Sequence, residues 1–177
     1  HYSRLVIDCN RPLASPTLMP AISDGTTVGA NADVSAVQRQ ARIAAIHAPY
    51  HAAIAGELDR RQQAGTPTVL VLLHSFTPVM NGLARPWHCG VLYNRDTRLA
   101  HRLLAALQAE GDLEVGDNQP YAVSDDSDYA ANVHAEARGL PYVEIEIRQD
   151  LIADAAGQGA WARRLARLLP PLLAGLD

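Results

Sequence analysis

The pattern of apolar and polar positions changes sharply after one short run of the chain. Residues 69–73 are all apolar and partly β-branched, and His74 and Ser75 follow directly. Such a run predicts a strand that is buried on both faces in the centre of a sheet. Because open α/β sheets place their chemistry at the carboxyl ends of strands, His74 is a candidate metal ligand. The alternative is a histidine that caps the strand and has no further role.

Shorter segments repeat apolar residues with the period of a strand or of a helix. Pro49 falls inside the first helical pattern and predicts a kink or a split, and Pro170–Pro171 should end the last one. Residues 12–31, rich in Pro, Gly, Ser and Thr, predict a long loop. The expected strands are 5–9, 68–76, 88–93, 113–115 and 142–147, and the expected helices are 35–61, 96–107, 129–137 and 159–169.

This alternation of strands and helices predicts an α/β fold with a mixed, mostly parallel sheet sandwiched by helices. The chain has 177 residues, no internal repeat and no long linker, so we expect a single domain over residues 1–177. Residues 1–4 lead directly into the apolar segment 5–7. We therefore expect that the N-terminal part of this domain is missing from the sequence.

Composition excludes several classes of protein. Hydrophobic residues make up 48% and charged residues 19%, which is typical of a folded protein rather than a disordered one. The net charge of -4, with no basic stripe, argues against nucleic acid as the main partner. No apolar stretch approaches the ~20 residues of a membrane span. Cys9 and Cys89 form no CxxC pair, so we expect free thiols in a reducing cytoplasm and no cysteine zinc site.

Two histidines share one face of the predicted helix at residues 35–61. His47 and His51 are spaced i,i+4, and this spacing alone can hold zinc. No glutamate completes an HExxH motif, and Pro49 disturbs the helix. Contact with a substrate, or a polar role in the interior, is therefore favoured over a metal pair.

Charged residues alternate with apolar ones in the strand expected at 142–147. Glu144 and Glu146 face one side, and the β-branched residues between them face the other. Carboxylates in such a strand are costly to bury unless they are paired or functional. The functional interpretation makes Glu146 a general base. The alternative is an edge strand with one solvated face, or an ion pair with arginine.

Two other places could contact a substrate. Asn10 and Arg11 follow the first expected strand, where a guanidinium beside an amide can bind a carboxylate in bidentate fashion. A solvated arginine is the alternative. Tyr121 lies in a loop rich in Ser and Asp, where it is either a mobile phenol over a pocket or a partly buried loop tyrosine.

Taken together, several segments resemble the N-formylglutamate amidohydrolase family. They follow the order found in that family and span nearly the whole chain. They are S-R-L-V-I-D-C-N-R-P at residues 3–12, H-A-P-Y-H at 47–51, H-S-F-T-P at 74–78, H-A-E-A-R-G-L-P at 134–141 and E-I-E-I-R-Q-D-L at 144–151.

The resemblance implies a fold like that of the zinc carboxypeptidases and a role for individual residues. His74 is similar to the last zinc-ligand histidine of those enzymes, and Glu146 to their catalytic glutamate. Asn10 and Arg11 resemble the pair that holds the terminal carboxylate of the substrate. Tyr121 resembles their mobile catalytic tyrosine.

The resemblance also implies zinc-assisted amide hydrolysis of a small N-acyl amino acid. Zinc on His74 and on two ligands upstream of His1 would lower the pKa of a water towards ~7, and Glu146 would take its proton. Tyr121 and His51 would contact the substrate or the oxyanion. The expected reaction converts N-formyl-L-glutamate to formate and L-glutamate, the last step of one histidine-degradation route, in the cytoplasm.

One departure from the zinc carboxypeptidases leaves alternatives open. Those enzymes supply two zinc ligands from an HxxE motif before the Asn-Arg pair, and residues 1–9 contain no such motif. A hydrolase of another N-acyl amino acid or of a peptide is one alternative. A metal-free binding domain of the same fold is the other.

Overall fold

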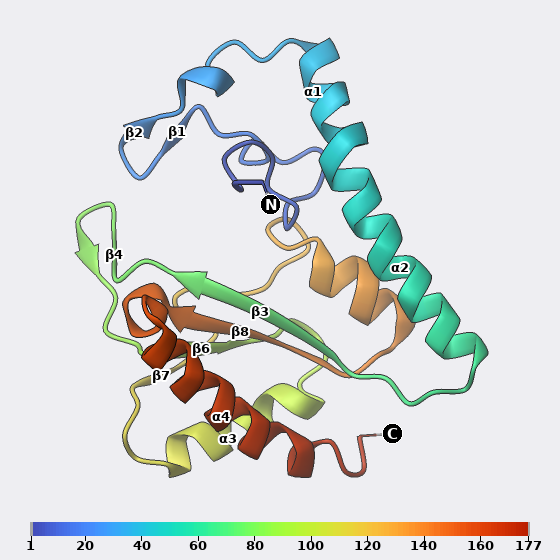
Figure 1. Ribbon diagram of the computed structural model, residues 1–177, viewed down its shortest axis with the longest axis vertical. Helices are drawn as coiled ribbons and strands as arrows, with labels where there is room; N and C mark the ends of the chain where they lie inside the picture. Colours follow the sequence, from blue (N-terminus) through green and yellow to red (C-terminus); the bar gives the residue numbers. More distant parts are fainter. Residues whose placement is uncertain (1, 177) are drawn as a thin grey trace. The chain divides into compact units, whose positions relative to one another are not determined.

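The computed structural model describes residues 2–176 (Figure 1). Contacts within the chain divide it into two compact units. Unit 1 comprises His1–Thr68 and Ser124–His134, and unit 2 comprises Val69–Val123 and Ala135–Asp177. Each unit thus joins segments that are distant in the sequence. The expectation of a single domain that lacks its N-terminal part stays a prediction.

Unit 2 contains a four-stranded mixed sheet. Its order is β3 (Leu70–Phe76), β8 (Tyr142–Arg148), β6 (Cys89–Leu92) and β7 (Val115–Asp117). The pairs β3–β8 and β6–β7 are parallel, and β6–β8 is antiparallel. The prediction of an α/β fold with a mixed, mostly parallel sheet is therefore confirmed, whereas the likeness to the zinc carboxypeptidases stays a prediction.

Two helices of unit 2 build its hydrophobic core on one side of the sheet. They are α3 (Arg98–Ala109) and α4 (Ala155–Leu172). Apolar residues of both helices pack against the β-branched side chains of β8 that the alternation places on this side. The core residues are Cys89, Val91, Leu99, Ala100, Leu103, Leu107, Val143, Ile145, Ile147, Trp161 and Leu176.

The prediction that the strand at residues 68–76 is central and buried on both faces is wrong. Within the described sheet, β3 lies at one edge, and its only partner there is β8. Alternate side chains are accordingly exposed, with Val71 39% and Leu73 62% accessible. The two inner strands of the described sheet are β8 and β6, and the residues of β8 up to Ile147 are all buried. An apolar run looks the same in the sequence whether its strand lies at the edge or inside the sheet, because the sequence pattern does not specify which strands are neighbours.

A tight hairpin follows β3 in unit 2. Its strands are β4 (Val79–Met80) and β5 (Leu83–Ala84). The two residues between them, Asn81 and Gly82, both have positive φ values of 49° and 75°. This Asn-Gly pair matches the preference of the hairpin turns that need φ above zero at both positions. The hairpin therefore holds a fixed conformation.

Unit 1 is dominated by one long helical segment. It consists of α1 (Ala36–Arg42), the π-helical turn η2 (Ile43–His47) and α2 (Ala48–Gln63). Ser35 caps its start by accepting a hydrogen bond from a backbone N–H of the first turn.

Pro49 lies in the first turn of α2, where the segment divides into two α-helices, as the sequence predicts. The helix widens into the π turn η2 just before it, where the N–H of Ala48 bonds to the carbonyl of Ile43. A proline lacks an N–H and its ring collides with the carbonyl four residues earlier, so one extra residue in the turn relieves both problems. The π turn thus joins the two α-helices.

The strand expected at residues 5–9 does not form. This segment makes turns, and the N–H of Asp8 donates to the carbonyl of Leu18 at 2.9 Å. Ile7 is buried in a small separate cluster with Leu18 and Met19. The apolar run is short enough to be buried by this cluster without a sheet partner.

Residues 12–31 are mostly irregular, as predicted. They contain the short hairpin β1 (Ile22–Ser23) and β2 (Thr26–Thr27) and the 3-10 turn η1 (Gly29–Asn31). The buried side chain of Asn31 donates hydrogen bonds to the carbonyls of Leu5 and Pro20. The polar side chain at the end of this loop thus ties it to the segment at residue 5.

The helix expected at residues 129–137 is a π turn, η3 (Ala131–Ala135), followed by a 3-10 turn, η4 (Glu136–Arg138). Gly139 ends it with a φ of 66°, as the sequence predicts.

The last helix differs from its prediction at both ends. It follows the 3-10 turn η5 (Gln149–Ile152), and Asp154 caps its first turn. It then continues through Pro170–Pro171, although these prolines were expected to end it. They lie in the last turn, where terminal carbonyls accept hydrogen bonds from the guanidinium of Arg102 in α3.

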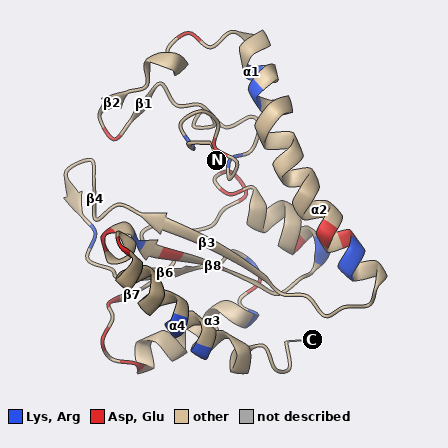
Figure 2. Ribbon diagram, viewed as in Figure 1, with Lys and Arg blue, Asp and Glu red and all other residues tan. Residues whose placement is uncertain are grey.

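None of the described helices combines the length and the apolar character needed to cross a bilayer. Charged residues are mixed in sign along several elements (Figure 2). At the end of α2, for example, Glu57 pairs with both Arg60 and Arg61. Such exposed pairs contribute little to stability.

Gly90 in β6 should not tolerate a side chain. A Cβ atom there would lie 1.9 Å from the backbone oxygen of Gln119. We expect Gly90→Ala to lower the free energy of unfolding by about 3 kcal/mol, measured by chemical denaturation. The matched control is Gly159→Ala in α4, where a Cβ would meet only the flexible side chain of Arg163. That change should raise stability by about 0.5–1 kcal/mol. Equal effects of both substitutions would contradict the close packing at Gly90.

Candidate functional site

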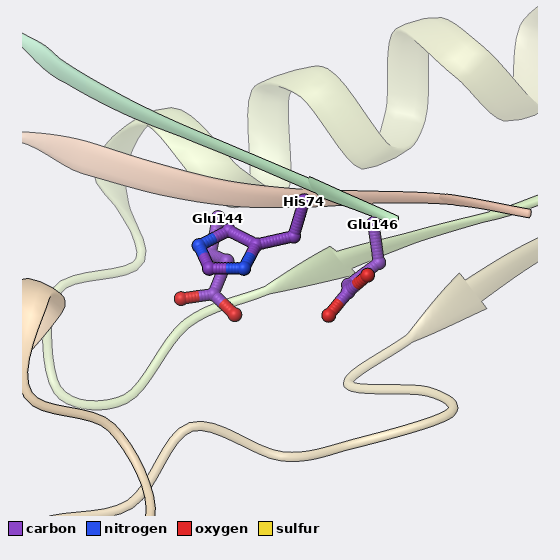
Figure 3. A group of neighbouring side chains, drawn as sticks. All are labelled: His74, Glu144 and Glu146. Atoms are coloured by element: carbon purple, nitrogen blue, oxygen red, sulfur yellow. The ribbon is translucent and has the colours of Figure 1, made fainter. Parts of the chain in front are cut away.

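Three potential metal ligands gather on one side of the sheet of unit 2. His74 and Glu146 are direct partners in the parallel ladder between β3 and β8, so their side chains point the same way. Glu144, two residues earlier in β8, shares this side. Ligand atoms of the three residues all lie within 4.8 Å of one another. Figure 3 shows the imidazole and the two carboxylates extending from adjacent strands toward a common space.

The chemistry of this group suits a divalent metal ion. Imidazole nitrogen and carboxylate oxygen are the usual ligands of catalytic zinc. Glu144 and Glu146 are 3% and 5% exposed, and burying two neighbouring carboxylates is costly unless positive charge lies close by. Figure 2 shows the acidic positions of β8 inside the sheet. The residues present therefore fit a metal ion of this kind.

Two glycines shape the sheet beside this group. Gly90 is the ladder partner of Glu146, and Gly116 in β7 is the partner of Gly90, so both lie on the side of the carboxylates. The backbone oxygen of Gln119 packs against both, within 2.8 Å or less of where a Cβ atom would stand. The loop after β7 can cross this side of the sheet because neither strand has a side chain there. Tyr121 lies on this loop.

The Asn10–Arg11 turn belongs to unit 1 and is held by hydrogen bonds. The Asp8 carboxylate accepts the backbone N–H of Asn10 at 2.9 Å. The Asn10 amide donates to Asp128 at 3.0 Å and accepts from the N–H of Ala130 at 3.0 Å. The Arg11 guanidinium donates to backbone carbonyls, among them that of Asn10 at 3.2 Å. The turn is thus fixed by residues more than a hundred positions away in the sequence.

Buried histidines hold the same turn from the helix side. The Nε2 atom of His51 lies 2.7 Å from the carbonyl of Cys9, and that of His47 lies 3.3 Å from the carbonyl of Arg11. These two carbonyls flank Asn10 on either side. The i,i+4 spacing that the sequence reveals therefore lets one helix face contact both ends of a three-residue turn.

The hydrogen bonds of this cluster fix the tautomers of two histidines. A carbonyl only accepts, so the Nε2 atom of His51 carries the proton and its Nδ1 atom accepts. That Nδ1 atom lies 2.8 Å from Nε2 of His134, which must then be the donor. Both His47 and His134 lie in π-helical turns, a feature that is frequent at functional sites.

The pKa of His51 is lowered to about 4, chiefly by burial and in addition by electrostatic repulsion from the neighbouring imidazoles of His47 and His134. The hydrogen bond to the Cys9 carbonyl opposes this shift because it favours the charged form. His51 is therefore neutral in the folded protein at pH 7.

The structure brings the predicted residues together in two groups, one in each unit. His74 and Glu146 lie in unit 2, where Tyr121 also lies, and Asn10, Arg11 and His51 lie in unit 1. Both ring nitrogens of His51 are engaged within the protein, so in this conformation it holds the turn and offers neither nitrogen to a ligand. Its role as a substrate contact stays a prediction.

Sequence reasoning missed two members of these groups. Glu144 was placed on the same strand side as Glu146 but was given no role; its position two residues earlier is the sequence feature that could have identified it. His134 opens the family-like segment at residues 134–141, which is the sequence feature that could have identified it. Its contact with His51 joins positions 83 residues apart and exists only in the folded chain.

Known proteins resemble this chain over nearly its whole length. A sequence model of the N-formylglutamate amidohydrolase family matches residues 1–153. A gene product from Agrobacterium tumefaciens of known crystal structure is 39% identical, with a TM-score of 0.94 over 99% of this chain and 69% of that one. An N-formylglutamate amidohydrolase from Ralstonia eutropha is 20% identical, with a TM-score of 0.63 over 96% and 72% of the two chains, a likeness of fold alone. No curated protein sequence matches the chain.

The neutral state of His51 predicts a loss of stability in acid. Its pKa is about 4 in the folded protein and 6.5 ordinarily, so below pH 6.5 the unfolded chain takes up the proton more readily. The free energy of unfolding should fall between pH 6.5 and about 4, by up to about 3 kcal/mol. In His51→Gln, which keeps a donor toward the Cys9 carbonyl, this fall should be smaller. The control His101→Gln changes an exposed histidine and should retain it. Identical pH profiles for all three proteins, from denaturation between pH 4 and 8, would contradict this assignment.

Proposed function

Because this chain belongs to the N-formylglutamate amidohydrolase family, a family of hydrolases, we propose that it is a metal-dependent amidohydrolase that cleaves N-formyl-L-glutamate to formate and L-glutamate. The observation that carries the proposal is the pairing of His74 with Glu146 in one ladder, beside Glu144. It unites a metal ligand with a potential base inside the segment that the family model matches.

In this proposal Glu146 moves the proton. Its carboxylate accepts a proton from the attacking water and passes it to the departing amine, so that the C–N bond breaks as the new C–O bond is retained. A strand buried on both faces keeps the carboxylate in place, which limits the reorganisation needed during the reaction. Tyr121, on the loop that crosses this side of the sheet, is proposed to contact the oxyanion.

His74 would hold the metal ion, and Glu144 offers a further oxygen ligand. Such an ion, when bound, supplies Lewis-acid chemistry: it polarises a carbonyl and lowers the pKa of water. We propose zinc, since a histidine with carboxylates is a typical ligand set for it. The two further ligands expected upstream of His1 lie outside the described residues.

Asn10 and Arg11 are proposed to bind a carboxylate of the substrate. A guanidinium recognises a carboxylate through two parallel hydrogen bonds, and the neighbouring amide adds a third donor. His47 and His51 support this role by fixing the carbonyls on both sides of Asn10. Holding the substrate in this way converts an encounter into an oriented attack.

Glu146→Gln should abolish most of the activity of the zinc-loaded protein. The substitution keeps the size of the side chain but removes the proton acceptor, so kcat for formate release from N-formyl-L-glutamate should fall about 10²- to 10⁴-fold. The control Glu114→Gln changes an exposed carboxylate of the same unit and should keep full activity. Full turnover by Glu146→Gln would contradict its role. Absence of formate release by the wild-type protein would contradict the proposed reaction, and N-acetyl-L-glutamate and N-formyl-L-leucine would then test the other N-acyl substrates.

His74→Ala should lose bound zinc. Removing the single imidazole of the ligand group should weaken zinc binding about 100-fold or more, measured by titration calorimetry and by metal content after dialysis. His101→Ala removes an exposed imidazole from α3 and should bind zinc as the wild-type protein does. Equal zinc content in the two variants would show that His74 is no ligand.

A further inference from the structure

Arg85 is fixed at the end of the sheet where His74 and Glu146 lie. Its backbone N–H donates to the carbonyl of Pro78 at 2.8 Å, which closes the β4–β5 hairpin directly after β3. The next two carbonyls, of Pro86 and Trp87, accept hydrogen bonds from the guanidinium of Arg148 at 3.1 and 3.3 Å. Arg148 ends β8, two residues after Glu146. Arg85 is therefore tied to the carboxyl ends of both strands that carry the ligand group.

The side chain of Arg85 contacts the loop that crosses the carboxylate side of the sheet. Its Nη1 atom donates to the hydroxyl of Tyr121 at 2.8 Å, and its guanidinium carbon lies 4.8 Å from the centre of the tyrosine ring. These two contacts restrict the rotation of a long side chain. They orient the guanidinium before any ligand arrives, which reduces the entropy that binding costs.

The positive charge of Arg85 is available to a ligand in this position. Within residues 2–176 its guanidinium contacts the phenol of Tyr121 and not a carboxylate. Other arginines of unit 2 are used differently, because Arg95, Arg98 and Arg148 each form an ion pair with an aspartate or glutamate. The contact to Tyr121 uses one N–H of Nη1, and a guanidinium has five. A planar edge therefore stays available for a carboxylate.

The proposed substrate, N-formyl-L-glutamate, has a side-chain carboxylate for which no residue of unit 2 has been assigned so far. We propose that Arg85, oriented by Tyr121, binds this side-chain carboxylate and so sets the preference for N-formyl-L-glutamate over its uncharged amide. This inference rests on the proposed function and deepens it.

The test compares two substrates that differ in this one charge. N-formyl-L-glutamine has the shape of N-formyl-L-glutamate but an uncharged amide in place of the side-chain carboxylate. In the zinc-loaded protein, Arg85→Gln should lower kcat/KM for N-formyl-L-glutamate about 10- to 100-fold and leave that for N-formyl-L-glutamine nearly unchanged. Arg85→Lys retains the charge without the planar fork, so it should lose only part of the selectivity. Arg163→Gln, an exposed arginine of α4, is the control and should change neither value.

Calorimetric titration of both compounds into the same proteins separates this inference from the proposed function. Selective loss of N-formyl-L-glutamate affinity in Arg85→Gln supports the inference even if no formate is released, an outcome that would contradict the reaction alone. Equal losses for both compounds would show that Arg85 only holds the Tyr121 loop, and would overturn the inference. No loss for either, or a wild-type protein that does not distinguish the two compounds, would overturn it as well. Melting temperature and zinc content establish that each variant is folded. If Arg85→Gln is not folded, Arg85→Lys provides the same comparison of the two compounds.

Discussion

The parallel pairing of β3 with β8 in a single register is the constraint on which the candidate site depends. It places His74 opposite Glu146 and sends both side chains away from the hydrophobic core. A slip of one residue in β8 would turn Glu144 and Glu146 into the core beneath α3 and α4. Burying two carboxylates in that core would cost far more free energy than the strand pairing contributes. Burial of the apolar face of β8 therefore fixes both the register and the position of the ligand group.

Two glycines beside the ligand group are as important for the site as the ligand side chains themselves. Gly90 and Gly116 leave room for the backbone of Gln119, and so the Tyr121 loop can cross the side of the sheet that bears the carboxylates. The Asn-Gly turn and the guanidinium of Arg148 fix the segment from β4 to β6 at the same end. Substrate recognition by Arg85 would then depend on backbone contacts made by other residues, and these contacts set where its guanidinium points.

Unit 1 is organised by polar contacts more than by a sheet. The expected strand at residues 5–9 is replaced by turns, and the carbonyls of Cys9 and Arg11 accept hydrogen bonds from the buried His51 and His47. The low pKa of His51 is the result of this burial. A turn held in this way presents Asn10 and Arg11 with little freedom, which is what recognition of a planar carboxylate requires.

The sequence by itself determined the alternation of strands and helices, the alternating faces of β8, the shared helix face of His47 and His51, and the family. All of these depend only on the spacing of residues that are close in the sequence, or on short motifs. The sequence could not determine that β3 lies at the edge of the described sheet and β8 inside it, that Pro49 is absorbed by a π turn, or that His134 meets His51 and Arg85 meets Tyr121. Each of these joins residues that are distant along the chain or depends on strand order. Only the packed structure decides such pairings, since the side-chain pattern of a segment is the same whichever neighbour it has.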